Sequence, residues 1–351
     1  MNARELSKYN VGENLDQLMN LDPRGYGVCR ILYPAARKAM GSSLCMKTAE
    51  TLHAILSQDK RPKSEKAPVY IMTGFVLKEH ECPETDGITG ALLLARALVV
   101  AYDVTPVFVI PKKCVSAITA AAPHLGLHAY ADVEKAKSVS LSLAYMTISE
   151  DVQEAAAETE AILEMPKPAA LFCTESAGAN AKGVYHNAVG ADITSLEAKS
   201  DALFNALKKA GVPTFAVGDL GNEMGMGLIK RHVEKYIPNG KEIIAATSAD
   251  YLVTATVSDW GVYAVIAALA YLNGKIEIMH DEQMEEAVLR ACCLSGMVDM
   301  TGSLLPAIDG FSVDIEKQIV ALMRSTVEYA IAYPQNKWFD GVLEKGFYGK
   351  Y

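Results

Sequence analysis

Long apolar runs are missing from this 351-residue sequence. The longest uninterrupted one, residues 262–272, is too short to cross a bilayer. The polar N-terminal segment MNARELSKYNVGENLDQL lacks the apolar stretch of a signal peptide. We therefore expect a soluble protein with no membrane partner and no targeting segment.

Basic clusters and paired cysteines are missing as well. The chain has 33 basic and 42 acidic residues, a net charge of −9, and no Lys/Arg cluster interleaved with aromatic residues. This composition argues against nucleic acid and anionic membranes as partners. The seven cysteines are scattered and form no C-x-x-C, which argues against a disulfide framework and a thiolate zinc site. A reducing cytoplasm is the compartment that fits best.

The familiar motifs of nucleotide-binding and hydrolytic enzymes are also missing. The glycine-rich stretch at residues 218–227 contains no G-K-[ST] and does not follow G-x-G-x-x-G. The chain has no G-x-S-x-G and no H-E-x-x-H. The polar chemistry left to it consists of carboxyl groups, amides, hydroxyls and backbone N–H groups.

Buried strands and helices alternate through most of the chain. The pattern predicts an α/β fold, with a mainly parallel sheet covered by helices on both faces, a Rossmann-like three-layer sandwich. The strands are expected at residues 69–72, 107–110, 169–173, 214–217 and 251–255. We expect a single domain over residues 1–351, with a helical lead-in at 1–20 and an aromatic C-terminal tail at 334–351. A homo-oligomer is compatible with this organisation.

Two helix starts are expected from local capping signals. Thr194 and Glu197 have the spacing of a capping box, which predicts a helix from there to about Ala210. Ser258 or Asp259 is expected to be the N-cap of an apolar helix that ends near residue 272.

The most informative stretch is GDLGNEMGMG at residues 218–227, directly after a predicted strand. Its glycines allow positive φ and close backbone approach to a ligand, and its acids can accept protons, hold an amine or bind a hard cation. The alternative is a tight turn whose acids cap the next helix. The candidate functional residues here are Gly218, Asp219, Gly221, Asn222 and Glu223.

Other predicted strands also end in polar loops. Because the carboxyl ends of parallel strands lie on one edge of a sheet, we expect these loops to meet, with Asp86 facing Asp219 across one cleft. The candidate residues in these loops are Thr73, Gly74, Glu84, Thr85, Asp86, Gly87, Glu175, Asn187 and Asp259.

The ordered set of motifs resembles the D-glutamate cyclase family over about residues 15–325. The pieces that carry the resemblance are TGF (73–75), ETDG (84–87), ESAG…YHNA (175–188), GDLGNEMGMG (218–227), SDWG (258–261) and IDG (308–310). The likeness is to the domain that forms the C-terminal part of the larger mitochondrial members, which also carry a hydro-lyase-like region. It implies dehydration of a small amino acid, D-glutamate, to 5-oxo-D-proline.

The chain departs from the family pattern at two positions. Leu220 stands where the family usually has glycine, which is expected to narrow or reshape the pocket. Ser176 stands where the family commonly shows arginine. If that arginine holds a substrate carboxylate, the substrate of this chain differs.

Cyclisation of glutamate calls for a base that accepts the ammonium proton and an acid that donates to the leaving oxygen. We expect Asp219 and Glu223 to face Glu84 and Asp86 in these roles, with the other candidate residues binding substrate. Replacement of Asp219 or Asp86 by Asn is expected to remove turnover and leave the fold intact. No cofactor is required, although Mg²⁺ or Mn²⁺ between the acids remains an alternative.

The same residues permit other interpretations. Arg24, in a loop with Gly25 and Gly27, could reach a substrate carboxylate or form a surface ion pair. The protein could instead be a Mg-dependent phosphate- or nucleotide-binding transferase. A third possibility is a non-catalytic binder of a small acidic metabolite.

Overall fold

The computed structural model of the chain describes residues 2–333 and 337–346. The predicted helical lead-in is helix α1 (Ala3–Met19). The predicted aromatic tail lies partly outside the described residues, and its described part contains helix α14 (Lys337–Glu344). In the part of the chain that is described, no helix has the length and hydropathy needed to cross a membrane.

A seven-stranded sheet forms the centre, with the order β5-β6-β4-β1-β7-β8-β9 and every neighbouring pair parallel. Strands such as Val69–Met72 and Thr214–Gly218 are buried along their whole length, as expected for strands covered on both faces. The predicted α/β fold with a parallel sheet is therefore confirmed. The strands are β1 (Val69–Met72), β4 (Pro106–Ile110), β5 (His128–Tyr130), β6 (Ser142–Thr147), β7 (Ala170–Thr174), β8 (Thr214–Gly218) and β9 (Tyr251–Thr254).

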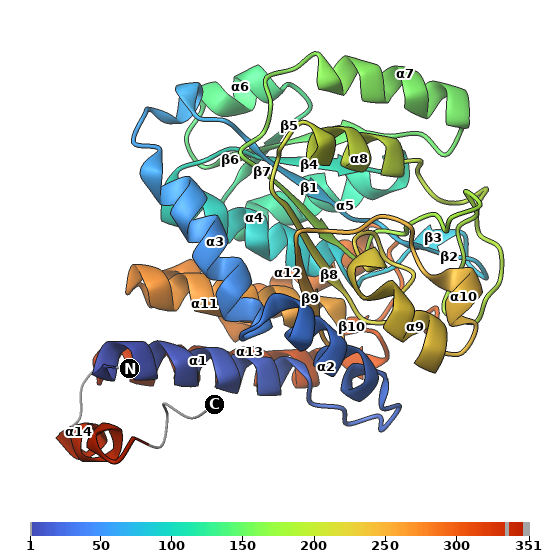
Figure 1. Cartoon of the computed structure of the whole chain (residues 1–351). Coiled ribbons are helices and arrows are strands. Elements are labelled where there is room, and N and C mark those ends of the chain that lie inside the picture. The colour runs from blue at the N-terminus through green and yellow to red at the C-terminus, as the bar shows by residue number, and fades with distance from the viewer. Residues whose placement is uncertain (1, 334–336, 347–351) are drawn as a thin grey trace.

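Helices cover both faces of the sheet (Figure 1). On one side lie α6 (Val133–Ser138), α7 (Val152–Leu163) and α8 (Asp201–Lys209). On the other side α11 (Ser258–Asn273) is the central helix, and its side chains from Ser258 to Ala270 are all buried. It contacts α1, α3 (Leu44–Gln58), α4 (Ile88–Tyr102) and α13 (Val313–Ala332).

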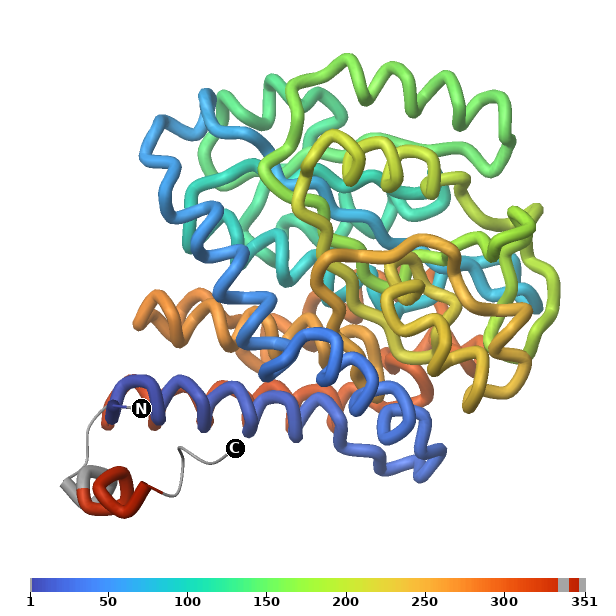
Figure 2. The backbone as a smooth tube through the Cα atoms, in the orientation of Figure 1, coloured from blue at the N-terminus to red at the C-terminus, as the bar shows by residue number. Residues whose placement is uncertain are grey.

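The two ends of the chain meet in this second layer. The blue helix α1 runs beside the red helix α13 (Figure 2). The remaining helices are α2 (Val28–Met40), α5 (Val115–Ala121), α9 (Lys230–Tyr236), α10 (Gly240–Ile243) and α12 (Glu282–Leu294).

The strand order reverses direction beside β1. From β1 the chain moves to β4 on one side, whereas β7, β8 and β9 follow on the other side. In open parallel sheets, ligands bind outside the carboxyl ends of the strands at such a reversal. A ligand site is therefore expected between the carboxyl ends of β1 and β7.

Two small antiparallel hairpins extend the loops at this edge. Strands β2 (Val76–Leu77) and β3 (Cys82–Pro83) pair within the loop after β1, and β10 (Ala307–Ile308) pairs with β11 (Phe311–Ser312). The turn of the second hairpin is Asp309-Gly310, with φ of 51° and 80°. Positive φ at both central residues is typical of a tight two-residue hairpin, and Asp-Gly suits it.

Both capping predictions are wrong. Residues 194–196 form a turn, and α8 begins only at Asp201. Glu197 is buried and its carboxylate accepts the N–H of Val76 at 2.9 Å, so tertiary structure uses the group that a capping box would need. The N-cap of α11 is Val257, without a side-chain cap of its own.

Candidate active site

Four loops that follow β1, β7, β8 and β9 meet at the predicted edge, and each brings buried carboxyl groups. The hydroxyl of Ser258 donates to Glu175 Oε2 at 2.6 Å, which joins the loops after β9 and β7. The backbone N–H of the same residue donates to Asp86 Oδ2 at 3.1 Å, which joins the loops after β9 and β1. The acid cluster consists of Glu84, Asp86, Glu175, Asp219, Glu223 and Asp259, all buried.

Asp86 caps the buried helix α11 from another loop. Its carboxylate accepts N–H groups from Asp259 at 2.8 Å, Ser258 at 3.1 Å and Gly87 at 2.9 Å. A carboxylate at a helix N-terminus also gains from the helix dipole. Burial raises the pKa of Asp86 to about 6, although these three N–H groups lower it. Asp86 is thus held as a fixed negative charge near neutral pH, with its oxygens already in use.

Glu223 holds the glycine-rich loop in shape. Its carboxylate accepts the N–H groups of Asp219 at 2.9 Å, Leu220 at 2.7 Å and Gly221 at 2.7 Å. The N–H groups of this loop were expected to be available to a ligand. They instead donate to a carboxylate of the same loop. A side chain on Gly218 would lie 2.9 Å from the Glu223 carboxyl carbon, so glycine is needed there for this close approach.

Asp219 and Glu84 are the acids of the cluster that remain available. Within the described chain, neither side chain makes a hydrogen bond or ion pair, and the two residues are 5% and 8% exposed. Burial first, then the charge of Glu175, raises the pKa of Asp219 well above its usual range. Burial and the charge of Asp86 do the same to the pKa of Glu84. Burial and the neighbouring charges therefore favour the protonated form of both carboxyl groups.

Glu175, Gly87 and Thr73 lie against one another between the ends of β1 and β7. A side chain on Gly87, where φ is 79°, would overlap the Glu175 side chain and approach Thr73 Oγ1 to 2.8 Å. Glu175 itself has φ of 39°, an uncommon value outside glycine that is often found at functional sites. Burial raises the pKa of Glu175 well above its usual range, and Glu223 adds to this effect.

The remaining candidate residues have mainly structural partners. The Gly74 N–H donates to the Glu175 carbonyl at 3.2 Å, and the Thr85 hydroxyl donates to the Ala307 carbonyl at 2.7 Å. The Asn187 side chain accepts the Ala191 N–H at 2.9 Å and closes a local turn. Asn222 donates its amide to the His186 carbonyl at 3.0 Å, and its buried amide oxygen has no partner among the residues that the structure describes.

A pocket of about 180 Å³ opens beside Asp219. Its walls include Arg24, Leu220 and Asp309. Arg24 forms an ion pair with Asp309 Oδ2 at 2.7 Å. Burial and then the charge of Asp86 raise the pKa of Asp309 to about 7, against the opposing effect of Arg24. The sequence analysis named Asp309 only as part of the IDG motif and not as a site residue. The Asp-Gly pair, which predicts a tight turn, is the sequence signal that could have identified it.

Three acids of the cluster could hold a cation. Glu175, Asp219 and Glu223 each offer an oxygen, and these oxygens lie within 4.8 Å of one another. Carboxylate oxygens are the ligands that Mg²⁺ and Mn²⁺ prefer. The residues therefore fit a hard divalent cation, whose binding would require their deprotonation.

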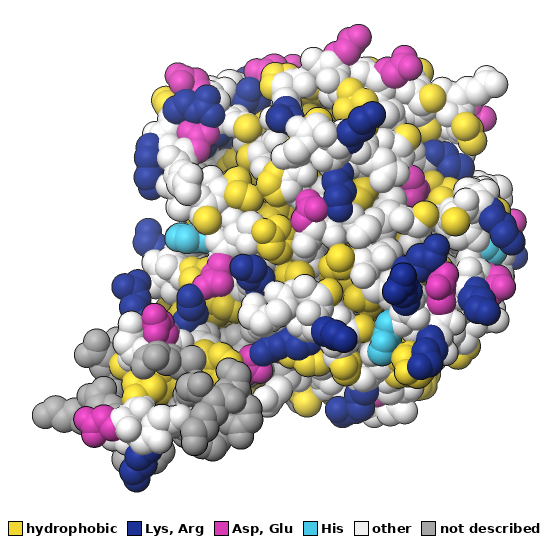
Figure 3. All heavy atoms as spheres, viewed as in Figure 1, with side chains coloured by type: hydrophobic (Ala, Val, Ile, Leu, Met, Phe, Trp, Pro, Cys, Tyr) yellow, Lys and Arg dark blue, Asp and Glu magenta, His cyan; other side chains and the backbone are white. Residues whose placement is uncertain are grey.

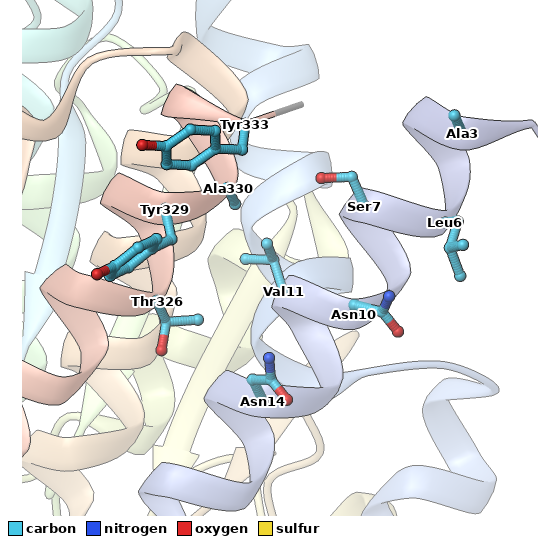
Figure 4. A pocket seen from close by; sticks show the side chains of 10 residues that line it. All are labelled: Ala3, Leu6, Ser7, Asn10, Val11, Asn14, Thr326, Tyr329, Ala330 and Tyr333. Carbon is cyan, nitrogen blue, oxygen red and sulfur yellow. The ribbon is translucent and has the colours of Figure 1, made fainter. Parts of the chain in front are cut away.

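One hollow elsewhere on the described surface contains less chemistry. It has a volume of about 230 Å³ and lies between α1 and α13, and its polar lining consists of Ser7, Asn10, Asn14, Thr326 and the hydroxyls of Tyr329 and Tyr333 (Figure 4). No carboxyl group, lysine or histidine lines it. Figure 3 shows lysine and arginine side chains scattered over one outer face, whereas the acid cluster is buried.

Comparison with known proteins agrees with this architecture. The family model described as D-glutamate cyclase-like, C-terminal, matches residues 15–324. The mitochondrial D-glutamate cyclase of Homo sapiens is 31% identical over 283 residues, which cover 78% of this chain and 41% of that protein. The chain thus spans about two fifths of that relative's length. By the extent of the family match, the chain belongs to the D-glutamate cyclase-like, C-terminal family.

Proposed function

We propose that this protein is a D-glutamate cyclase-like lyase. Its reaction is the dehydration of D-glutamate, or of a related small amino dicarboxylate, to the cyclic amide 5-oxo-D-proline. The family match and the activity in the relative's name support the reaction class. The observation that carries the proposal is a pair of acids, Asp219 and Asp309, lining one small pocket.

The chemistry needs two proton movements. The α-nitrogen forms a bond to the γ-carboxyl carbon, and one C–O bond of that carboxyl breaks. The ammonium group gives up two protons, and both leave with the departing oxygen as water. A base must therefore take a proton from nitrogen, and an acid must give one to the oxygen.

Asp309 and Asp219 suit these two roles. A pKa of about 7 lets Asp309 accept a proton from the ammonium group near neutral pH. The raised pKa of Asp219 keeps a proton ready for the leaving oxygen. The pocket fixes amine and carboxyl near each other, and such positioning lowers the barrier further. The charge of Asp86 makes Asp309 a stronger base, because it raises the pKa of that residue.

The pocket's size favours a small substrate. Its volume of about 180 Å³ is below the range of roughly 300–1,000 Å³ typical of sites for drug-sized ligands. A nucleotide also carries phosphates that need several cationic partners, and Arg24 is the single Lys or Arg among the pocket's lining residues. We therefore rank the nucleotide-binding transferase below the lyase.

The test is turnover by an Asp219→Asn variant. Because the Asp219 side chain has no partner among the described residues, the amide should leave the melting temperature nearly unchanged. Loss of the donated proton should slow lactam formation by about 100-fold or more. D-glutamate, L-glutamate and related dicarboxylates are incubated separately, and loss of water is followed by mass spectrometry with chiral chromatography.

Asp59→Asn is the matched control, since Asp59 lies at the end of α3 and pairs with the exposed Arg61. Its rate should equal that of the natural chain. An Asp219→Asn variant that retains full activity would show that Asp219 is not the proton donor. Absence of lactam from the natural chain with every dicarboxylate would contradict the proposed function itself.

A further inference from the structure

The loop between α1 and α2 is shaped to hold Arg24 over the pocket. Asp22 accepts the N–H groups of Gly25 at 2.9 Å and Gly27 at 2.7 Å, which closes the loop on itself. Both glycines have φ near 75°, a left-handed conformation that suits such a turn. Arg24 is thereby placed beside a hairpin almost 300 positions away in sequence, where it donates to the Asp309 carbonyl.

The guanidinium group is fixed from several sides. It pairs with Asp309 Oδ2 at 2.7 Å and donates to the Thr256 carbonyl at 3.2 Å. Its central carbon lies 4.9 Å from the ring centre of Tyr26 and 4.7 Å from that of Phe311. Rings at these distances favour a cation. A side chain held in this way is preorganised for a ligand, because little rotamer freedom remains to be lost.

The same group keeps an unused donor. Arg24 Nε is buried and has no partner in the described part of the chain. The side chain is 17% exposed and lines the pocket together with Asp219 and Asp309. Asp22 also lines the pocket, but its two carboxylate oxygens accept the N–H groups of Gly25 and Gly27. The pocket therefore combines one fixed cation with two further carboxyl groups. That arrangement matches a small molecule with one carboxylate, an adjacent ammonium group and a second carboxyl group.

We infer that Arg24 binds the α-carboxylate of the substrate and thereby selects α-amino acids over amines that lack this group. This inference rests on the proposed function and assigns the orientation of its substrate. The γ-carboxyl must lose an oxygen and needs a proton donor, whereas a guanidinium group does not give up its proton. Arg24 is therefore suited to the carboxylate that survives the reaction. The α-ammonium group then lies next to Asp309, and the γ-carboxyl points toward Asp219.

The experiment compares D-glutamate with 4-aminobutyrate, which has the amine and the reacting carboxyl but no α-carboxylate. Steady-state rates are measured for the natural chain and for Arg24→Gln, and D-glutamate binding is measured by calorimetry. Loss of a charge-assisted hydrogen-bond partner should raise KM and Kd for D-glutamate by about tenfold or more. The KM for 4-aminobutyrate should stay within about twofold, because that substrate has no α-carboxylate for Arg24 to bind. Because Arg24 lowers the pKa of Asp309, its loss should change kcat alike for both substrates.

Arg61→Gln is the control, since Arg61 is 56% exposed and pairs with Asp59 on the surface. It should leave both substrates unaffected. Arg24→Lys keeps the charge without the planar fork, so an intermediate rise in KM for D-glutamate alone is expected. If Arg24→Gln does not fold, the KM values of Arg24→Lys for the two substrates test the role of Arg24 instead.

The outcomes separate the two proposals. Equal KM values for D-glutamate in the natural chain and the Arg24 variants, or an equal rise in KM with both substrates, would overturn the role of Arg24 and leave the lyase proposal standing. Arg24-dependent binding of D-glutamate without lactam formation would support Arg24 and overturn the lyase. A natural chain that neither binds nor converts D-glutamate would overturn both.

Discussion

Asp309 is the residue where local backbone and site chemistry are most closely tied. It occupies the first central position of the β10–β11 turn with φ of 51°, and its carboxylate pairs with Arg24. Burial and the charge of Asp86 nevertheless raise its pKa to about 7. The fold therefore favours the protonated form of this side chain more than the unfolded chain does.

This shift predicts a pH dependence of stability. A carboxyl whose folded pKa lies above its unfolded value stabilises the fold fully below the unfolded pKa of about 4, and this contribution is lost as pH rises through about 7. The free energy of unfolding should therefore fall between pH 5 and pH 8. Each tenfold change in proton affinity corresponds to about 1.4 kcal/mol, so Asp309 contributes on the order of a few kcal/mol.

Chemical denaturation at several pH values, with the natural chain and Asp309→Asn, checks this expectation. Asparagine tolerates the left-handed conformation and does not titrate. The variant's free energy of unfolding should change less steeply over the same pH range. Identical slopes for the two proteins would show that Asp309 does not titrate between pH 5 and pH 8.

At the scale of single elements, the starts of α4 and α11 are joined. Gly87 is the N-cap of α4, and its N–H is shared by Asp86 Oδ1 at 2.9 Å and Asp259 Oδ1 at 2.8 Å. Asp86 in turn caps α11. The two helices start more than 160 positions apart in sequence. The carboxylate beside the start of each one accepts backbone N–H groups at the start of the other. Asp86→Asn is therefore expected to cost stability as well as activity, which revises the expectation drawn from sequence.

Gly90 in the first turn of α4 tests this packing. In an ordinary helix, replacing glycine by alanine stabilises by up to about 1 kcal/mol. Here the new methyl group would overlap the Asp259 carboxylate and lie 3.0 Å from its Cγ. Gly90→Ala should therefore destabilise the chain by about 1–3 kcal/mol, as overpacking does elsewhere.

The same substitution at Gly341 in α14 is the control, because a methyl group there meets nothing within 4 Å. Thermal unfolding of both variants gives the comparison. A Gly90→Ala variant as stable as Gly341→Ala would mean that the two helix starts separate at little cost.

At the scale of the whole molecule, the loops after β7 and β8 could be tied together by a cation. We propose that Glu175, Asp219 and Glu223 in their deprotonated forms bind Mn²⁺ or Mg²⁺, on the ground that their oxygens lie within 4.8 Å of one another. Bound metal would therefore compete with the protonated state in which Asp219 donates its proton. A ligand that binds only the folded chain at 100 times its Kd stabilises it by about 2.7 kcal/mol. The melting temperature should therefore rise with MnCl₂, and a chelator should reverse the rise.

Asp219→Asn removes one of the charged ligands and should abolish most of this rise. Potassium chloride at equal ionic strength controls for screening. An unchanged response in the variant would locate the metal effect elsewhere, and metal analysis of the purified protein would show whether an ion is retained.

The amino-acid sequence determined the layered fold. Continuous apolar segments such as Val69–Met72 and Thr214–Gly218 can be buried on both faces only within a parallel sheet covered by helices. Because parallel strands end on one edge, the polar loops after them had to meet, and the ordered motifs marked the family. These conclusions depend on patterns that neighbouring residues share, which a single sequence displays.

Tertiary structure alone decided what each acid does. Glu197 was expected to cap its own helix and instead binds the N–H of Val76, and Asp86 caps a helix that begins at Ser258. Glu223 is occupied by its own loop, whereas Asp219 is left facing the pocket with Arg24 and Asp309. The physical reason is that a carboxyl group's pKa and availability depend on burial and on partners far along the chain, and no local spacing encodes those distances.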